Sequence, residues 1–251
     1  MIELAIAYAR RGWPVFPLAP DSKVPAIAKD RGGNGCLDAT LDLNRVEQWW
    51  GEYPQANVGI ATGRRAGLLV IDVDPNNAPG WLDSLQSLKL PRTFVVRTWS
   101  GGWHLYFAYD FTRRITLGAK LLPGIDWRGQ GGYVVAPGSV VNGRLYEIAR
   151  NAPIAPAPAA LIERIEAARH TRRVEIDASG HMVLELGRRN DTLMRVGCAM
   201  RRWGVEFNAI LAALSAINSE HCEPALDEDE LRQIAASCAR YEPARVPQGA
   251  A

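Results

Sequence analysis

The chain has 251 residues, of which 47% are hydrophobic and 22% are charged, so it can bury a core and is not disordered throughout. Its formal net charge is only +2, which excludes the histone-like or polybasic way of binding nucleic acid. No apolar run approaches the roughly 20 residues of a membrane span, no basic region of a secretory signal follows Met1, and the four cysteines form no Cys-x-x-Cys pair; we therefore expect a cytoplasmic protein.

Residues 1–150 mix helical and strand patterns. Apolar side chains at helical spacing predict a helix that stops at Gly12, a second between Asp42 and Gly51, and a third over 79–88. Apolar runs predict strands over 14–18, 68–74, 93–99, 104–109, 133–135 and 144–148. Residues 100–103, Ser-Gly-Gly-Trp, are typical of a hairpin turn. Helices beside hairpins favour a mixed α+β sheet over a doubly wound one.

The composition changes at residues 151–160, which hold three prolines among alanines. Proline can neither continue a helix nor lie inside a sheet, so we expect a linker or an extended strap there. Residues 1–150 carry a net charge of +4 and residues 151–251 a net charge of −2. The basic first half is therefore the better candidate for a phosphate-bearing ligand.

The second half is predicted to be a small helical bundle. Three amphipathic patterns follow one another, and the first ends at Gly204. We interpret its arginines either as residues that bind a template strand or as a solvated face opposite the acidic run 227–230. The negative charge of this half favours the solvated face. These arginines are Arg188, Arg189, Arg195, Arg201 and Arg202.

A pair of aspartates ends the most apolar strand. Side chains alternate along residues 68–75, Leu-Leu-Val-Ile-Asp-Val-Asp-Pro, so Asp72 and Asp74 point to one face about 6.6 Å apart along the strand. Two such carboxylates repel each other unless a cation joins them, and carboxylate oxygens suit Mg²⁺ or Mn²⁺. The pair is interpreted as a metal site or, alternatively, as a strand end with polar side chains in solvent.

A third aspartate and a histidine lie beside glycines. Asp126 stands in Gly-Ile-Asp-Trp-Arg-Gly, where glycine lets the backbone approach a ligand and Arg128 is suited to a phosphate. His104 follows the Gly-rich turn at 100–103, where an imidazole can contact phosphate or transfer a proton. Taken singly, Asp126 can also cap a turn, and His104 can be a buried strand histidine.

Three carboxylates and a histidine among Gly-rich strands predict metal-assisted phosphoryl or nucleotidyl transfer. The chain has no Gly-Lys dipeptide, so it lacks a Walker A loop and is not an ATP-driven motor. The residues alone leave a polymerase, a nuclease and a glycosyltransferase with an Asp-x-Asp motif open.

At these motifs the chain resembles the primase-polymerase domain of the archaeo-eukaryotic primase superfamily, found in plasmid and phage replication proteins. The three motifs of that family are an apolar strand that ends in Asp-x-Asp, a strand that starts with small-x-His, and a later apolar-Asp pair. They match residues 70–74, 102–104 and 125–126, in the same order. The similarity covers roughly residues 1–150, and residues 187–242 resemble the helical primase C-terminal module that often follows.

This resemblance implies an α+β fold with a mixed-sheet, RRM-like catalytic core and a small C-terminal helical bundle. The domains would be the core over 1–150, a linker and connecting helix over 151–186, the helical module over 187–242, and a tail over 243–251. The Pro/Ala-containing end indicates a linker to a further region, so we expect the N-terminal part of a larger replication protein.

The resemblance also implies a role for each matched residue. Asp72, Asp74 and Asp126 would hold Mg²⁺ or Mn²⁺, and His104 would contact the triphosphate of the incoming nucleotide. Lys23 and Arg128 are further candidates for phosphate contacts.

The sequence departs from the family at one position. The family often has a serine two residues before the histidine, and Gly102 stands there in this chain. We expect Ser100, or the N–H groups of Gly101 and Gly102, to contact phosphate in its place.

The function expected is that of a DNA primase and template-dependent DNA polymerase in phage or plasmid replication. Its partners would be a single-stranded template, a primer, dNTPs or NTPs and a replicative helicase, with no membrane. The alternatives are a metal-dependent nuclease that uses the same aspartates, and a non-catalytic origin or single-strand DNA-binding module. In the binding module, Trp99, Trp103 or Trp127 would stack on bases.

Overall fold

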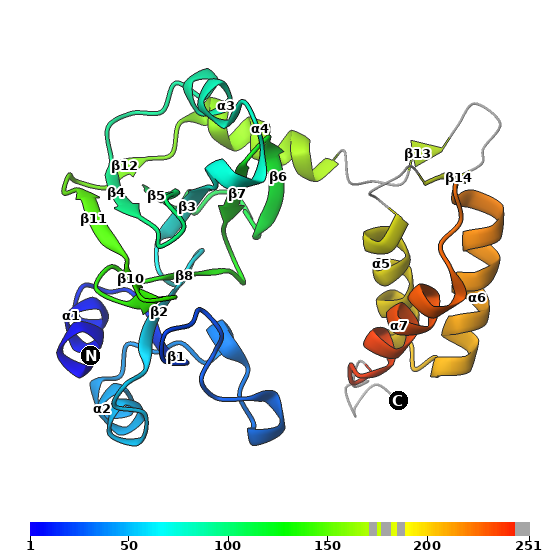
Figure 1. Ribbon diagram of the computed structural model, residues 1–251, viewed down its shortest axis with the longest axis horizontal. Coiled ribbons are helices and arrows are strands. Elements are labelled where there is room, and N and C mark those ends of the chain that lie inside the picture. Colours follow the sequence, from blue (N-terminus) through cyan, green and yellow to red (C-terminus); the bar gives the residue numbers. More distant parts are fainter. Residues whose placement is uncertain (171–174, 177–181, 185–188, 244–251) are drawn as a thin grey trace. The chain divides into compact units, whose positions relative to one another are not determined.

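The structure is a computed structural model that describes residues 1–170, 175–176, 182–184 and 189–243. It divides into two compact units, residues 1–170 and a helical unit within residues 171–251 (Figure 1). Each unit is described by itself. The predicted α+β class, with a mixed sheet and a C-terminal helical bundle, is confirmed.

A seven-stranded sheet forms the centre of the first unit. Its strands lie in the order β11, β4, β5, β3, β7, β6, and their bounds are Glu147–Arg150, Phe94–Arg97, Trp103–Ala108, Leu68–Val73, Ile125–Arg128 and Gly118–Leu122. All of these neighbours are antiparallel. The seventh strand, β12 (Ala155–Pro156), pairs in parallel with β5 just beyond the end of β4. The apolar run of β3 is therefore central, with β5 on one side and β7 on the other.

A smaller sheet covers one face of the large one. It holds β1 (Val15–Leu18), β2 (Asn57–Ala61) and β8 (Tyr133–Val135), all antiparallel, with helices α1 (Ile2–Arg10) and α2 (Leu43–Glu52) packed nearby. One core unites these elements with alternate side chains of the central strands; its largest members include Trp13, Phe16, Phe94 and Tyr106. Tight packing of such large rings fixes the distance between the two sheets.

The other face of the large sheet carries its own core. The alternate side chains of β3 and β5 join Trp127 of β7, and helices α3 (Trp81–Ser87) and α4 (Ala159–His170) cover them. Figure 1 shows α3 and α4 on the opposite side of this sheet from α1 and α2. Leu161, Ile162 and Ile165 of α4 are buried in this core, so residues up to His170 belong to the first unit by contact.

Local sequence explains where the elements begin and end. Asp42 caps α2 by accepting a hydrogen bond from the Asn44 N–H at 3.0 Å. After α1, Gly12 has a φ of 86°, which glycine adopts without strain and which ends the helix. Residues 98–102 form the turn between β4 and β5, as the sequence predicts.

Several short elements were not predicted. The run 144–148 is predicted as one strand, but it divides at buried Tyr146 into β10 (Arg144–Leu145), which pairs with β9 (Val140–Val141), and β11. Strands β2, β6, β7, β9 and β12 are additional to the predicted ones. Within the proline-rich segment, β12 makes the chain an ordered strap against β5 rather than a free linker.

The helical unit consists of α5 (Arg189–Arg202), α6 (Phe207–His221) and α7 (Glu228–Ala239), with a short pair of strands, β13 (Glu175–Ile176) and β14 (Met182–Val183). Its core includes Leu193, Ile210, Leu214 and Ile234. None of the helices that the structure describes is long and apolar enough to cross a membrane.

Arg189 and Arg201 of α5 have partners inside this unit. Arg189 donates to the Pro224 carbonyl, and Arg201 pairs with Glu206 at 2.9 Å. Arg188 and residues 244–251 lie outside the described residues, and the roles predicted for them stay predictions.

Candidate active site

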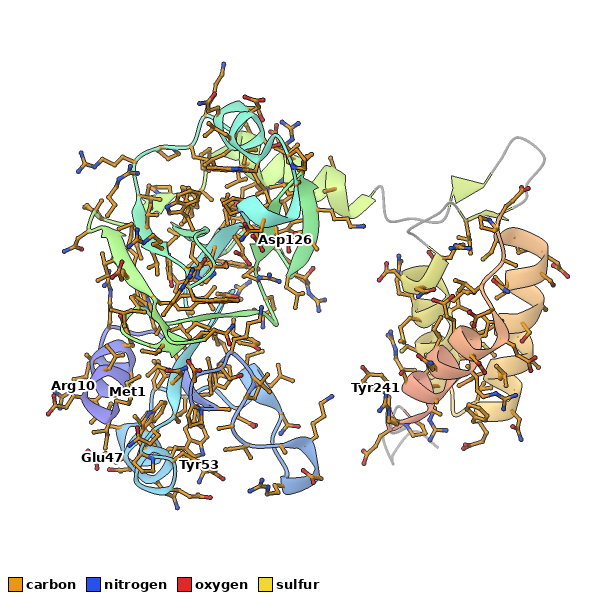
Figure 2. The ribbon with its side chains drawn as sticks, viewed as in Figure 1. Met1, Arg10, Glu47, Tyr53, Asp126 and Tyr241 are labelled. Carbon is orange, nitrogen blue, oxygen red and sulfur yellow. The ribbon has the colours of Figure 1, made fainter. Side chains whose placement is uncertain are left out.

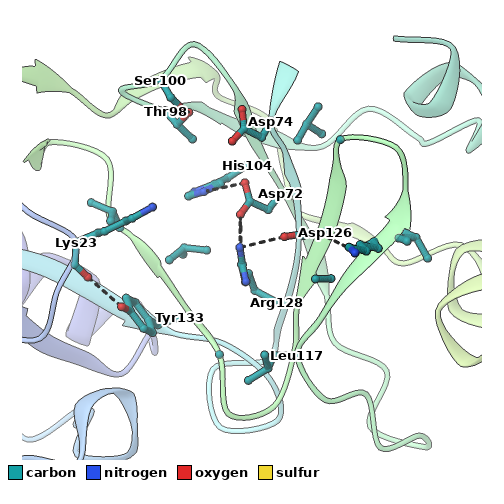
Figure 3. Close-up of a pocket in the computed structure, with 18 of the residues that line it drawn as sticks. Lys23, Asp72, Asp74, Thr98, Ser100, His104, Leu117, Asp126, Arg128 and Tyr133 are labelled. Carbon is teal, nitrogen blue, oxygen red and sulfur yellow. Dashed lines mark hydrogen bonds and ion pairs between the residues drawn. The ribbon is translucent and has the colours of Figure 1, made fainter. Parts of the chain in front are cut away.

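A cavity of about 1060 Å³ opens beside the carboxyl end of β3. Asp72, Asp74, His104, Asp126 and Arg128 all line it, and so do Lys23 and Ser100 from the loops around it (Figure 3). The structure thus brings most of the predicted site residues together on one cavity wall. Gly101 and Gly102 do not line it.

Three of these side chains lie in a row across the central strands. In the sheet register, Asp72 of β3 stands opposite His104 of β5 and also opposite Asp126 of β7. Residues directly opposite each other in antiparallel strands share a face and have Cβ atoms about 5 Å apart. The apolar residues next to them along the strands point to the other face of the sheet. Ile71 and Trp127 are fully buried there.

Asp74 lies just beyond the strand, and one of its carboxylate oxygens is engaged by a backbone N–H. It caps a short 3₁₀ turn, Pro75–Asn77, where its carboxylate accepts a hydrogen bond from the Asn76 N–H at 3.1 Å. Because Pro75 ends β3 at this point, Asp74 stands at the rim of the cavity (Figure 3).

Arg128 supplies the positive charge that the paired carboxylates require. It follows Asp126 by two residues on β7, so both side chains project to the cavity face. Its Nη2 lies 2.7 Å from Asp72 Oδ2 and 3.5 Å from Asp126 Oδ2. The other oxygen of Asp126 accepts a hydrogen bond from the Lys120 N–H at 2.8 Å. The guanidinium therefore lies between two of the three predicted metal ligands.

His104 is held in the row as a neutral imidazole. Its side chain is 7% exposed, and its Nε2 lies 3.5 Å from Asp72 Oδ1. Burial lowers the pKa of His104; the charge of Asp72 opposes that shift, and those of Arg128 and Lys23 reinforce it. Nδ1 is buried without a hydrogen-bond partner among the described residues. A neutral imidazole has one donor and one acceptor nitrogen, so it can donate a hydrogen bond to an anion.

The turn before His104 explains the glycine at position 102. A Cβ on Gly102 would lie 2.2 Å from the carbonyl oxygen of Val73, so this backbone has no room for a serine. The N–H groups of Gly101 and Gly102 donate to the Thr98 carbonyl and to Thr98 Oγ1, each at 3.1 Å. Both amides are thus engaged within the turn, and the hydroxyls of Thr98 and Ser100, 3.1 Å apart, are the turn's hydroxyl groups that line the cavity.

The wall opposite the row comes from the small sheet and its loops. Lys23 lies in the loop after β1, and its carbonyl accepts a hydrogen bond from the Tyr133 hydroxyl at 2.9 Å (Figure 3). Tyr146 is buried beside His104, with the two ring centres 5.7 Å apart. Because burial raises the pKa of Tyr146, its hydroxyl stays protonated.

Sequence reasoning missed several residues of this cavity. They are Thr98, Lys120, Tyr133 and Tyr146. Each comes from a loop or short strand that only the folded sheets bring near Asp72. Tyr133 alone carried a signal, because it begins the strand predicted over 133–135.

The donor chemistry of the row fits a divalent metal ion. Three carboxylates line one cavity, and Arg128 stands in for a cation between Asp72 and Asp126. In the part of the chain that the structure describes, no three His, Cys, Asp or Glu side chains are gathered closely enough to hold a metal. Gathering these carboxylates around a metal therefore requires Arg128 to move.

Comparison with known protein families gives two matches that follow one another along the chain. The model of a family described as bifunctional DNA primase/polymerase, N-terminal, matches residues 5–160. The model described as primase C terminal 1 matches residues 181–244. A search of curated proteins found no match. The first match spans both sheets and every residue of the row, and the second spans the three helices of the other unit.

Proposed function

This chain belongs to the bifunctional DNA primase/polymerase family, and from that premise we propose that it is a template-dependent nucleotidyltransferase that makes DNA primers and extends them. The row of Asp72, His104 and Asp126 across β3, β5 and β7 is the observation that carries the proposal. It brings two carboxylates and an imidazole that can bind phosphate together on one wall of a cavity large enough for a nucleotide.

Members of this family generally use divalent metal ions, and we propose Asp72, Asp74 and Asp126 as the residues that hold Mg²⁺ or Mn²⁺ here. Two such ions, when bound, neutralise the charge that develops on the attacking and leaving oxygens. Arg128 then exchanges its contact with Asp72 for oxygens of the nucleotide triphosphate, which a guanidinium binds in a bidentate way.

The protein side chains position the triphosphate for transfer. His104 donates a hydrogen bond to it from the row, and Lys23 contacts it from the opposite wall. The primer 3′-hydroxyl attacks the α-phosphate in line, the new O–P bond forms as the bond to the β-phosphate oxygen breaks, and pyrophosphate leaves. We assign no protein general base, so the hydroxyl proton passes to solvent.

The test is the extension of a labelled primer on a template, with dNTPs or NTPs and Mg²⁺ or Mn²⁺. We expect the variant with both Asp72→Asn and Asp74→Asn to lose activity by about 100-fold or more, because the charge that gathers the metals is gone. The control is Asp83→Asn, which removes an exposed carboxylate of α3 outside the cavity. Full activity in a folded double variant would refute the proposal.

The same gel distinguishes the two rival functions. A nuclease shortens the labelled strand where a polymerase lengthens it. A non-catalytic binding module gives salt-sensitive DNA binding with no metal-dependent turnover. An unprimed template in a parallel lane separates primer synthesis from primer extension.

The wider context is part of this proposal. The helical module that follows the catalytic unit supports a role in replication, where a replicative helicase would expose the single-stranded template. We place that role in phage or plasmid replication. Stimulation of primer synthesis on duplex DNA by an added replicative helicase would support the pairing, and equal synthesis with and without it would contradict it.

A further inference from the structure

We propose that a second cavity, next to the acidic one, binds a base and a phosphate of the single DNA strand that passes the catalytic row. The inference rests on the function proposed above and adds to it a binding site for that strand. The cavity measures about 390 Å³, and its wall includes Arg97, Trp99, Arg144 and Leu145. Arg97 ends β4, Trp99 lies in the turn that follows, and Arg144 and Leu145 form β10.

The two cavities adjoin each other. Thr98 and Trp99 line both of them, so this turn separates the cavity of the carboxylates from the second cavity. A strand with its reacting end at Asp72 that crosses Trp99 would reach the second cavity. This adjacency favours nucleic acid over an unrelated ligand as its occupant.

Trp99 is the tryptophan placed to stack on a base. Of the three candidates from the sequence, Trp127 is fully buried, and its Nε1–H donates to the Thr116 carbonyl at 2.7 Å. Trp103 packs against Trp81, with the ring centres 5.0 Å apart. Trp99 is partly exposed where the two cavities meet. Stacking on tryptophan tolerates any base sequence, as a template strand requires.

Arg144 places a positive charge beside the backbone of Trp99. Its side chain is exposed, and its Nη1 donates to the Trp99 carbonyl at 3.5 Å. Arg97, on the same wall, pairs with Glu147 at 2.5 Å, so its charge is balanced. Leu145 adds an apolar side chain that is 46% exposed. An aromatic ring, an arginine and an apolar surface together fit single-stranded nucleic acid.

The primary test measures binding of fluorescein-labelled oligo(dT) to the full chain by anisotropy, in EDTA and without nucleotides. We expect Trp99→Ala and Arg144→Gln each to weaken binding about tenfold. Arg144→Gln should also lower the salt dependence of log Kd by about 0.7, the value for one phosphate contact on a single strand. Trp99→Phe should restore part of the affinity, because phenylalanine also stacks.

The controls change matched residues outside both cavities. Phe111→Ala removes an aromatic side chain that is 54% exposed, and Arg10→Gln removes an exposed arginine that projects outward from α1 (Figure 2). Both should bind oligo(dT) as the parent chain does. Arg144→Gln leaves the packing intact, so it tests the cavity even if Trp99→Ala unfolds. Parental affinity and salt dependence in Arg144→Gln would overturn the inference.

A second readout separates the strand from the incoming nucleotide. If the parent chain extends primers, Arg144→Gln should raise the KM for primed template about tenfold and leave the KM for dNTP unchanged. The reverse pattern would assign Arg144 to the nucleotide and refute the inference. If the parent chain binds oligo(dT) through Trp99 and Arg144 but extends no primer, the strand site stands and the polymerase proposal fails.

Discussion

Arg128 neutralises two carboxylates that would otherwise face each other across neighbouring strands. Its side chain is 30% exposed and that of Asp72 21%, so water screens the pair only in part. The guanidinium offsets the repulsion between the two aspartates when the sheet forms. In the proposed function the same contact would oppose metal binding, because a cation and the guanidinium would compete for the same oxygens.

We expect Arg128→Gln to make the stability of the protein depend on metal. In EDTA, the unpaired carboxylates should lower the free energy of unfolding by about 1–3 kcal/mol. Added Mn²⁺ should restore more stability in the variant than in the parent, because a ligand stabilises the state it binds. Urea unfolding with and without Mn²⁺ measures both effects.

The matched control is Arg97→Gln, which breaks an ion pair whose side chains are 58% and 45% exposed. Its effect on the free energy of unfolding should stay below about 1 kcal/mol. Equal responses of Arg128→Gln and Arg97→Gln to Mn²⁺ would contradict the competition.

In the proposed function His104 donates a hydrogen bond to the nucleotide, so the loss of its side chain should weaken nucleotide binding. We expect His104→Ala to raise the KM for dNTP about tenfold or more, the cost of one hydrogen bond to a charged group, and to leave oligo(dT) affinity unchanged. His104→Gln keeps a side-chain N–H and should recover part of the loss. Steady-state extension kinetics decide, and an unchanged KM in folded His104→Ala would exclude the contact.

At the scale of elements, sequence patterns predicted those that carry a cap or a regular apolar run. The helix between Asp42 and Gly51 and the strand over 133–135 follow from capping and apolar runs, and the structure places them within a residue or two of the prediction. The four residues of β7 carry the correct alternation, but the flanking glycines hide it. Only pairing with β3 makes a strand of this segment, and so sequence reasoning could not place Asp126 opposite Asp72.

The candidate site also contains some residues that the sequence could predict and others that it could not. Asp72, Asp74 and His104 could be predicted because a regular strand or a Gly-rich turn marks each of them. Tyr146 and Lys120 could not, because Tyr146 lies where the predicted strand 144–148 divides and Lys120 belongs to β6, a strand that was not predicted. Residue type alone does not show whether a side chain can reach a ligand. Trp127 is a candidate for base stacking from the sequence, but the fold buries it completely.

The pairing of β6 with β7 depends on Gly118. A Cβ at this position would lie 2.0 Å from Trp127 Cζ2, in the core under the row. Gly118→Ala should therefore lower the free energy of unfolding by about 1–3 kcal/mol, the usual cost of overpacking. The control is Gly51→Ala, where a Cβ meets nothing within 4 Å. Urea unfolding compares them, and equal stability of the two variants would contradict this packing.

At the scale of the whole molecule, each unit has its own core. The cavity is lined entirely by residues of the first unit, from Lys23 to Tyr146. We therefore expect a fragment of residues 1–170 to fold cooperatively and to extend a primed template at a rate within about threefold of the full chain. Thermal unfolding and the primer assay check this. A fragment that folds and yet extends nothing would place an essential residue in the helical unit.

The strap β12 has a mechanical consequence. It forms a parallel ladder with β5, the strand that carries His104, and α4 then continues into the core through Leu161, Ile162 and Ile165. Tension applied to the chain beyond His170 meets the anchored helix first and the ladder second. The buried apolar side chains of α4 would therefore have to leave the core before a pulling force reached β5 and His104.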